Sequence, residues 1–122
     1  GYSDPYCIVS LKNNGKQIPN INQYKTSIIK RTVNPLWDET FSIPVLLKQI
    51  TPQTRIYFDL WDKDNDLDDS LGTASLNMNY FNNKNVFRGW LKVINDNTSD
   101  FERAFDYVKK KTMANIFGDE YD

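Results

Sequence analysis

Residues 55–72 of the chain read RIYFDLWDKDNDLDDSLG, and this stretch decides the fold. In its first half, Ile56, Phe58 and Leu60 alternate with residues of mixed polarity. A period of two residues is typical of a β-strand that buries one face and leaves the other partly exposed. Five of the next eight residues, 62–69, are aspartates. The stretch therefore predicts a strand with one apolar face that runs into a highly charged loop.

Five further runs rich in β-branched and aromatic residues surround this strand, and clusters of Asn, Asp, Gly and Pro separate them. These runs cover residues 6–11, 24–30, 41–46, 70–78 and 89–94. Such runs are typical of antiparallel sheets. The first run ends at Asn13-Asn14-Gly15, which predicts a turn because an Asn-Gly pair tolerates positive φ. Short strands at this spacing predict an all-β sandwich or barrel.

The end of the sequence changes to a helical pattern. Ser99 and Glu102 match a capping box, and apolar residues recur at helical spacing over residues 101–108. Three lysines follow, where a helix C-terminus favours positive charge. We therefore predict a β domain over residues 1–96 and an extension over 97–122 that carries one amphipathic helix.

The composition excludes several classes of function. Fifteen basic residues against 16 acidic ones give a net charge of −1, which excludes a generally basic nucleic-acid binder. The absence of histidine excludes imidazole-ligated zinc sites and His-dependent catalytic triads within this chain. The single cysteine, Cys7, excludes a disulfide framework, and we expect it to be a small buried apolar residue. No apolar run approaches the roughly 20 residues that span a membrane.

The aspartates of the 62–69 loop repel one another unless a cation or solvent offsets their charge. Ca²⁺ takes about six to eight oxygen ligands and suits a flexible, carboxylate-rich loop. The alternative is a solvated acidic turn whose charges point into water. A glycosidase-type pair of carboxylates is a weaker alternative, because the spacing places no second catalytic acid.

An EF-hand does not fit this loop. Asp62, Asp64 and Asp66 match its first, third and fifth ligand positions. However, Leu67 stands where the sixth position requires Gly, and Thr73 stands where the twelfth requires a bidentate Glu. The flanking residues also predict strands where an EF-hand has helices. Any calcium site is therefore expected between β loops.

Four blocks of the sequence resemble the C2 domain in order and spacing. They are Tyr2-Ser3-Asp4-Pro5-Tyr6, then Lys25-Thr26, then Asn34-Pro35-Leu36-Trp37-Asp38-Glu39-Thr40-Phe41, and finally Leu60-Trp61-Asp62-Lys63-Asp64 with Asp69-Ser70-Leu71-Gly72. The resemblance covers residues 1 to about 94. It implies an all-β, antiparallel Greek-key β-sandwich that binds Ca²⁺ between loops at one end and docks on phospholipid headgroups. The C2 sandwich has two strands more than the six runs counted here, so we expect its first two strands to precede Gly1.

The resemblance also implies roles for individual residues. The expected metal ligands are Asp4, Asp62, Lys63 through its backbone carbonyl, Asp64 and Asp69, with Asp68 competing with Asp69 for the last position. The expected lipid contacts are Tyr6, Lys25 and Trp61 on a strand face, and Leu67 at the loop tip.

These inferences predict a non-enzymatic module of a larger signalling or membrane-trafficking protein, in which any catalysis lies outside this chain. We expect it to bind anionic phospholipid membranes in a Ca²⁺-dependent manner, as a peripheral membrane protein of the cytoplasm. The alternative is a calcium-independent C2-like scaffold that binds a protein partner. Asn65 favours this alternative, because many calcium-dependent members carry Arg at that position.

Overall fold

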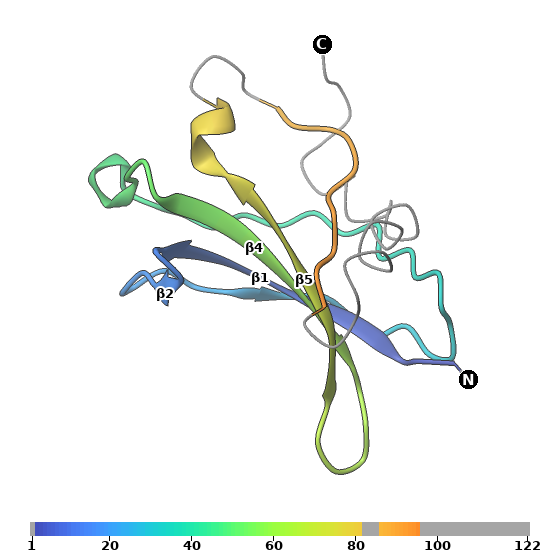
Figure 1. The fold of residues 1–122 in the computed structure, drawn as a ribbon. Helices are drawn as coiled ribbons and strands as arrows, with labels where there is room; N and C mark the ends of the chain where they lie inside the picture. Colours follow the sequence, from blue (N-terminus) through green and yellow to red (C-terminus); the bar gives the residue numbers. More distant parts are fainter. Residues whose placement is uncertain (1, 82–85, 96–122) are drawn as a thin grey trace.

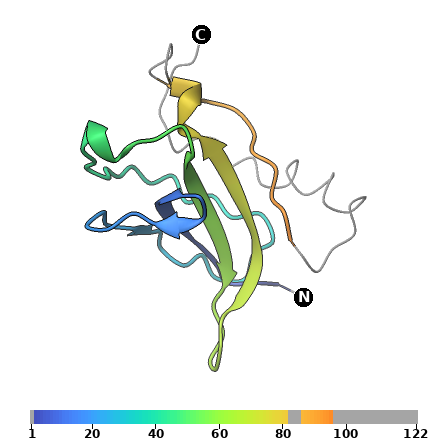
Figure 2. The same ribbon diagram turned by 60° about the vertical axis from the view of Figure 1, so that its left-hand side comes forward.

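The regular structure consists of five β-strands and two short 3-10 helices in residues 2–81 and 86–95, the part of the chain that the computed structural model describes (Figures 1 and 2). The strands are β1 (Pro5–Asn13), β2 (Lys16–Gln17), β3 (Tyr24–Lys25), β4 (Thr54–Asp62) and β5 (Asp69–Asn77). The 3-10 helices are η1 (Leu47–Gln49) and η2 (Met78–Phe81). The described residues contain no α-helix, and the helix expected within 97–122 lies outside them.

All five strands belong to one antiparallel sheet of order β2-β1-β4-β5, with β3 also paired to β1. The predicted all-β, antiparallel architecture is confirmed in this sheet. None of the helical segments among the described residues is long and apolar enough to cross a membrane.

The alternation read in residues 55–61 determines how β4 packs. Phe58 is fully buried and lies opposite Val9 of β1 and Ala74 of β5. The cross-strand pairs on either side of Phe58 are buried in the same way. One face of β1, β4 and β5 therefore forms the core, and this face includes Cys7 of β1. Because side chains alternate along a strand, Tyr6, Ile8 and Trp61 project from the opposite face, called here the outer face.

A tight hairpin joins β1 to β2. Asn13 pairs with Lys16, which leaves Asn14 and Gly15 as the two turn residues, with φ of 51° and 78°. Positive φ at both central positions is the geometry that an Asn-Gly pair favours in a two-residue hairpin turn. The turn expected here is therefore confirmed, whereas β2 itself had no hydrophobic pattern to predict it.

Three predicted strands are shorter than expected or absent. The run 24–30 forms a ladder only over β3, the run 41–46 forms none with any described strand, and the run 89–94 contributes a single bridge between Ile94 and Thr73. A strand requires a hydrogen-bonding neighbour about 4.8 Å away as well as the right side chains. Residues 41–46 have the residue types of a strand, but no such neighbour lies beside them among the described residues.

Side-chain contacts nevertheless hold Glu39 and Phe41, at the start of this segment, against the sheet. The rings of Phe41 and Tyr24 stack with centroids 4.1 Å apart. Glu39 accepts hydrogen bonds from the Tyr24 hydroxyl at 2.6 Å, and from the Ser27 backbone N–H at 3.0 Å and hydroxyl at 2.6 Å. Burial alone would raise the pKa of Glu39, but these hydrogen bonds outweigh it and lower the pKa. The ionised Glu39 thus anchors β3 to the next segment.

Candidate functional site

Strand pairing gathers acidic residues at one end of the sheet, called here the loop end. Pro5 pairs with Asp62, and Asp62 pairs with Asp69, so the end of β4 lies between the starts of β1 and β5. The chain from 63 to 68 projects beyond the sheet as the β4–β5 loop (Figure 1). Asp4, directly before β1, therefore lies beside this loop although 58 residues separate it from Asp62.

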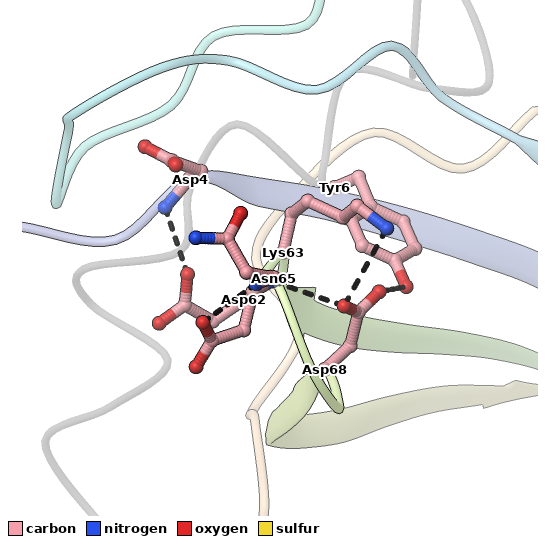
Figure 3. Close-up of polar contacts among 7 residues, drawn as sticks. Asp4, Tyr6, Asp62, Lys63, Asn65 and Asp68 are labelled. Atoms are coloured by element: carbon pink, nitrogen blue, oxygen red, sulfur yellow. Dashed lines mark hydrogen bonds and ion pairs between the residues drawn. The ribbon is translucent and has the colours of Figure 1, made fainter.

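Backbone amides hold two carboxylates of the loop end in place, that of Asp62, which Figure 3 shows, and that of Asp4. The Asp4 N–H donates to Asp62 Oδ1 at 2.9 Å, and the Lys63 N–H donates to the Asp4 carbonyl at 3.0 Å. The carboxylate of Asp4 in turn accepts the Arg31 N–H at 2.7 Å. Arg31 has a φ of 55°, so a left-handed residue presents this amide. The bridge between Ser3 and Thr32 holds that segment beside β1.

The remaining acidic residues of the loop differ in their contacts. Asp64 Oδ1 accepts the N–H of Asn65 at 2.7 Å. The carboxylates of Asp66 and Asp69 form no hydrogen bond or ion pair with any described residue. Leu67, at the tip, is 81% exposed. Most of the loop therefore leaves its charge in solvent.

Asp68 is held on the outer face of the sheet instead. Its Oδ2 accepts the Tyr6 hydroxyl, and its Oδ1 accepts the Asp64 N–H at 3.0 Å and lies 3.8 Å from Lys63 Nζ (Figure 3). The Asp64 amide is the largest cause of a lowered pKa for Asp68; the Tyr6 hydroxyl adds to it, and Lys63 and Lys25 contribute less. The same hydroxyl-to-carboxylate bond, with burial, raises the pKa of Tyr6 to about 12.

The expected lipid contacts Tyr6, Lys25 and Trp61 lie together on the outer face. Tyr6 pairs with Trp61 across β1 and β4. Lys25 Nζ stands over the Tyr6 ring, 4.6 Å from its centroid. The indole N–H of Trp61 is buried without a partner in the described part of the chain. Leu67 does not join this group, because it lies at the exposed loop tip.

The expected metal ligands are near one another, but they do not form a ready site. Among the described residues, no three acidic or cysteine side chains converge closely enough to hold a metal ion. The donors themselves fit Ca²⁺, since they are carboxylates. Asp4, Asp62 and Asp64 each accept a backbone N–H through one oxygen, which leaves the second oxygen without a hydrogen bond. The donor chemistry fits the ion, and its ligation requires these side chains to turn.

Sequence reasoning missed the contact between Tyr6 and Asp68 and the part that Lys63 plays through its side chain. Tyr6 and Asp68 are 62 positions apart in the sequence, and no motif links them. The pairing register of β1 on β4 is the signal that could have predicted the Tyr6–Asp68 contact. Once β1 is paired antiparallel to β4, Tyr6 lies opposite Trp61, which places it at the base of the acidic loop.

Comparison with known proteins agrees with the fold. The model of the C2 domain family matches residues 1–93. Human extended synaptotagmin-3 is 32% identical over 99 residues, which cover 81% of this chain and 10% of that protein. GTPase activating protein 1 of Oryza sativa subsp. indica is 34% identical over 76 residues, which cover 62% of this chain and 39% of that protein. The chain thus spans well under half the length of either relative.

A solved structure of two C2 domains of extended synaptotagmin 2, described as calcium bound, shares the fold. It aligns with a TM-score of 0.55 and 22% identity, over 79% of this chain and 31% of that one. The sequence blocks, the antiparallel sheet and the match over residues 1–93 lead to one conclusion. The chain belongs to the C2 domain family.

Proposed function

We propose that this chain is a calcium-dependent module that binds anionic phospholipid membranes. The C2 domain is a non-catalytic module, and the proposal concerns which ligands this member takes. One observation carries it: antiparallel pairing brings Asp4, Asp62 and Asp69 to a single sheet end, beside the outer-face group of Tyr6, Lys25 and Trp61. Cationic and aromatic side chains suit contact with an anionic membrane surface. The carboxylates beside them would repel that surface unless a bound cation lies between the two.

In this proposal, the loop end would hold Ca²⁺ through carboxylate oxygens. The residues we assign to it are Asp4, Asp62, Asp64 and Asp69 with the backbone carbonyl of Lys63, and Asp68 as the alternative to Asp69. Asp62 and Asp69 occupy opposite register positions, where two like charges destabilise a strand pair. Bound Ca²⁺ would supply positive charge that removes this repulsion and attracts anionic lipid.

The membrane would be contacted by two parts of the molecule. Lys25, which is exposed, and the half-buried Trp61 would meet headgroups from the outer face, and the ring of Tyr6, which is buried, would support the Lys25 ammonium from beneath. Leu67 would enter the headgroup region from the loop tip, and burying one such side chain contributes about 2 kcal/mol. That contribution is too small for stable anchoring alone, so neutralisation of the loop would determine whether the module binds.

Co-sedimentation with phosphatidylserine vesicles, with Ca²⁺ and with chelator, tests the proposal. We expect the 122-residue chain to bind only with Ca²⁺, and Asp62→Asn to weaken binding at least about tenfold, since it removes a charged ligand. Asp38→Asn is the matched control, because Asp38 is exposed, lies outside the loop, and has a φ of 49° that Asn tolerates. Equal binding with Ca²⁺ and with chelator would refute the calcium dependence.

A second candidate function is a calcium-independent scaffold for a protein partner. The observation in its favour is that backbone amides and Tyr6 already hold Asp4, Asp62 and Asp68 without a cation. Titration calorimetry separates the two functions, because this scaffold would release no heat of Ca²⁺ binding.

For the whole protein, we propose a peripheral membrane protein of the cytoplasm in signalling or trafficking, to which this chain contributes the binding module. Cys7 supports the cytoplasmic assignment, since it is a buried free thiol.

A further inference from the structure

Asp68 differs from every other acidic residue of the β4–β5 loop in what its carboxylate contacts. Both of its oxygens are engaged: Oδ2 by the Tyr6 hydroxyl of β1, and Oδ1 by the Asp64 N–H and the Lys63 ammonium of the same loop. Asp66, two residues earlier, has no such contact with the described residues. The side chain of Asp68 is only 21% exposed, whereas that of Lys63 is 52% exposed.

The groups in contact with the Asp68 carboxylate are all donors or cations. They comprise a hydroxyl, a backbone amide and an ammonium group, with Lys25 placed over the ring that carries the hydroxyl. Charge-assisted donors of this kind bind carboxylate and phosphate oxygens alike. Asp68 therefore fills, from within the chain, a position that suits an external oxyanion (Figure 3).

We propose that Asp68 is an internal competitor for this oxyanion position, and that the phosphate monoester of a lipid headgroup displaces it when the module reaches a membrane. The inference rests on the proposed function and adds a regulatory contact to it. Asp68 is thereby assigned to the outer face rather than to calcium ligation.

Charge favours the exchange. This holds for a headgroup that ends in a phosphate monoester, as in phosphatidic acid: it carries about −1.5 to −2 at neutral pH, against −1 for a carboxylate, and it offers three acceptor oxygens. An aspartate carboxylate is ionised at neutral pH, so the internal competitor is an anion under the same conditions. Its removal takes away the ion-pair partner of Lys63 and the carboxylate of Asp68 with which Lys25 also interacts. The outer face then gains net positive charge.

The first test compares Asp68→Asn with Asp66→Asn for binding to phosphatidic acid vesicles in the presence of Ca²⁺, the condition in which the proposed function has the chain bound. The two variants change the loop charge equally, but only the first removes the competing anion, and Asn keeps the shape of the side chain. We expect Asp68→Asn to tighten binding about fivefold more than Asp66→Asn, the scale of a charge-assisted contact near a membrane. Equal effects of the two variants would overturn the proposal.

The second test needs no membrane. Inorganic phosphate is titrated into the 122-residue chain, and the amide resonance of Asp64, which donates to Asp68, is followed by NMR. We expect a saturable shift that Lys63→Gln abolishes. Lys48→Gln should leave it unchanged, because Lys48 is an exposed lysine of η1. An Asp64 amide that does not respond to phosphate would refute the displacement.

The outcomes separate the two proposals. If the chain binds phosphatidylserine with Ca²⁺ while the Asp64 amide ignores phosphate, the function stands and the competitor role of Asp68 fails. If phosphate displaces Asp68 while Ca²⁺ has no effect on vesicle binding, the oxyanion position stands and the calcium-dependent function fails.

Discussion

The two ends of the sheet are built from opposite kinds of polar group. At the far end, defined here by Asn13, Gln49, Thr51 and Thr54, the polar side chains are neutral and hydrogen-bonded to one another or to backbone. At the loop end, the side chains are ionised and mostly carboxylates, with Lys63 as the one basic residue of the 62–69 loop, and they are partly exposed. The hydrogen bonds of the neutral network are satisfied within the chain. A cluster of carboxylates, in contrast, is stabilised by a bound cation or an oppositely charged surface. The far end therefore contributes to folding, and the loop end is available for binding.

The glycines that mark the two ends provide the largest expected contrast. Gly72, at the loop end, has a φ of 120°, and an added Cβ would lie 2.7 Å from Val93 Cγ1 and 2.8 Å from the Ile94 carbonyl oxygen. Gly15, in the β1–β2 turn, has a φ of 78° and nothing within 4 Å. We expect Gly72→Ala to cost about 3 kcal/mol through strain and overpacking, and Gly15→Ala about 1 kcal/mol through φ alone.

Urea denaturation followed by tryptophan fluorescence measures both glycine variants. Equal losses would mean that the close approach of residues 93–94 to β5 does not matter in solution.

Thr54 tests the neutral network of the far end. It is fully buried; its hydroxyl accepts the Thr51 N–H at 2.8 Å and donates to Asn13 Oδ1. Thr54→Val keeps the shape but leaves these groups unpaired, which we expect to cost about 2 kcal/mol. Thr40→Val, at an exposed position, should change stability by less than about 0.5 kcal/mol. Thermal unfolding with the same midpoint for both variants would contradict this account.

Asp69 tests the repulsion at the loop end and gives the smallest expected effect. It lies opposite Asp62, so Asp69→Asn should stabilise the calcium-free chain by about 0.5 kcal/mol. The gain should shrink in about 1 M salt, because exposed charges are screened there. Asp66→Asn, which removes a charge without a cross-strand partner, should give less. A salt-independent change, or a loss of stability, would argue against repulsion between these two carboxylates.

The sequence predicted the features that depend on local burial, and it did not predict those that depend on pairing between distant segments. The alternating pattern of residues 55–61 and the runs beside it predicted β1, β4 and β5, because burial of one face leaves a local trace of period two. The predicted strands over 41–46 and 89–94 were wrong for the described structure, since a ladder needs a neighbour that no local pattern specifies. Similarly, the aspartates were found from their density, but nothing local separated Asp68 from Asp66.

By itself, the sequence determined the class of the fold, the identity of the core face and the position of the charged loop. These depend on residue type at short spacing, and burial acts on each residue nearly independently. Only the tertiary structure decided which charges meet. The register of β1 on β4 sets Tyr6 at the base of the loop and brings its hydroxyl to Asp68, 62 residues away. A one-residue slip would turn Tyr6 toward the core, so this contact is a property of the pairing and not of any segment alone.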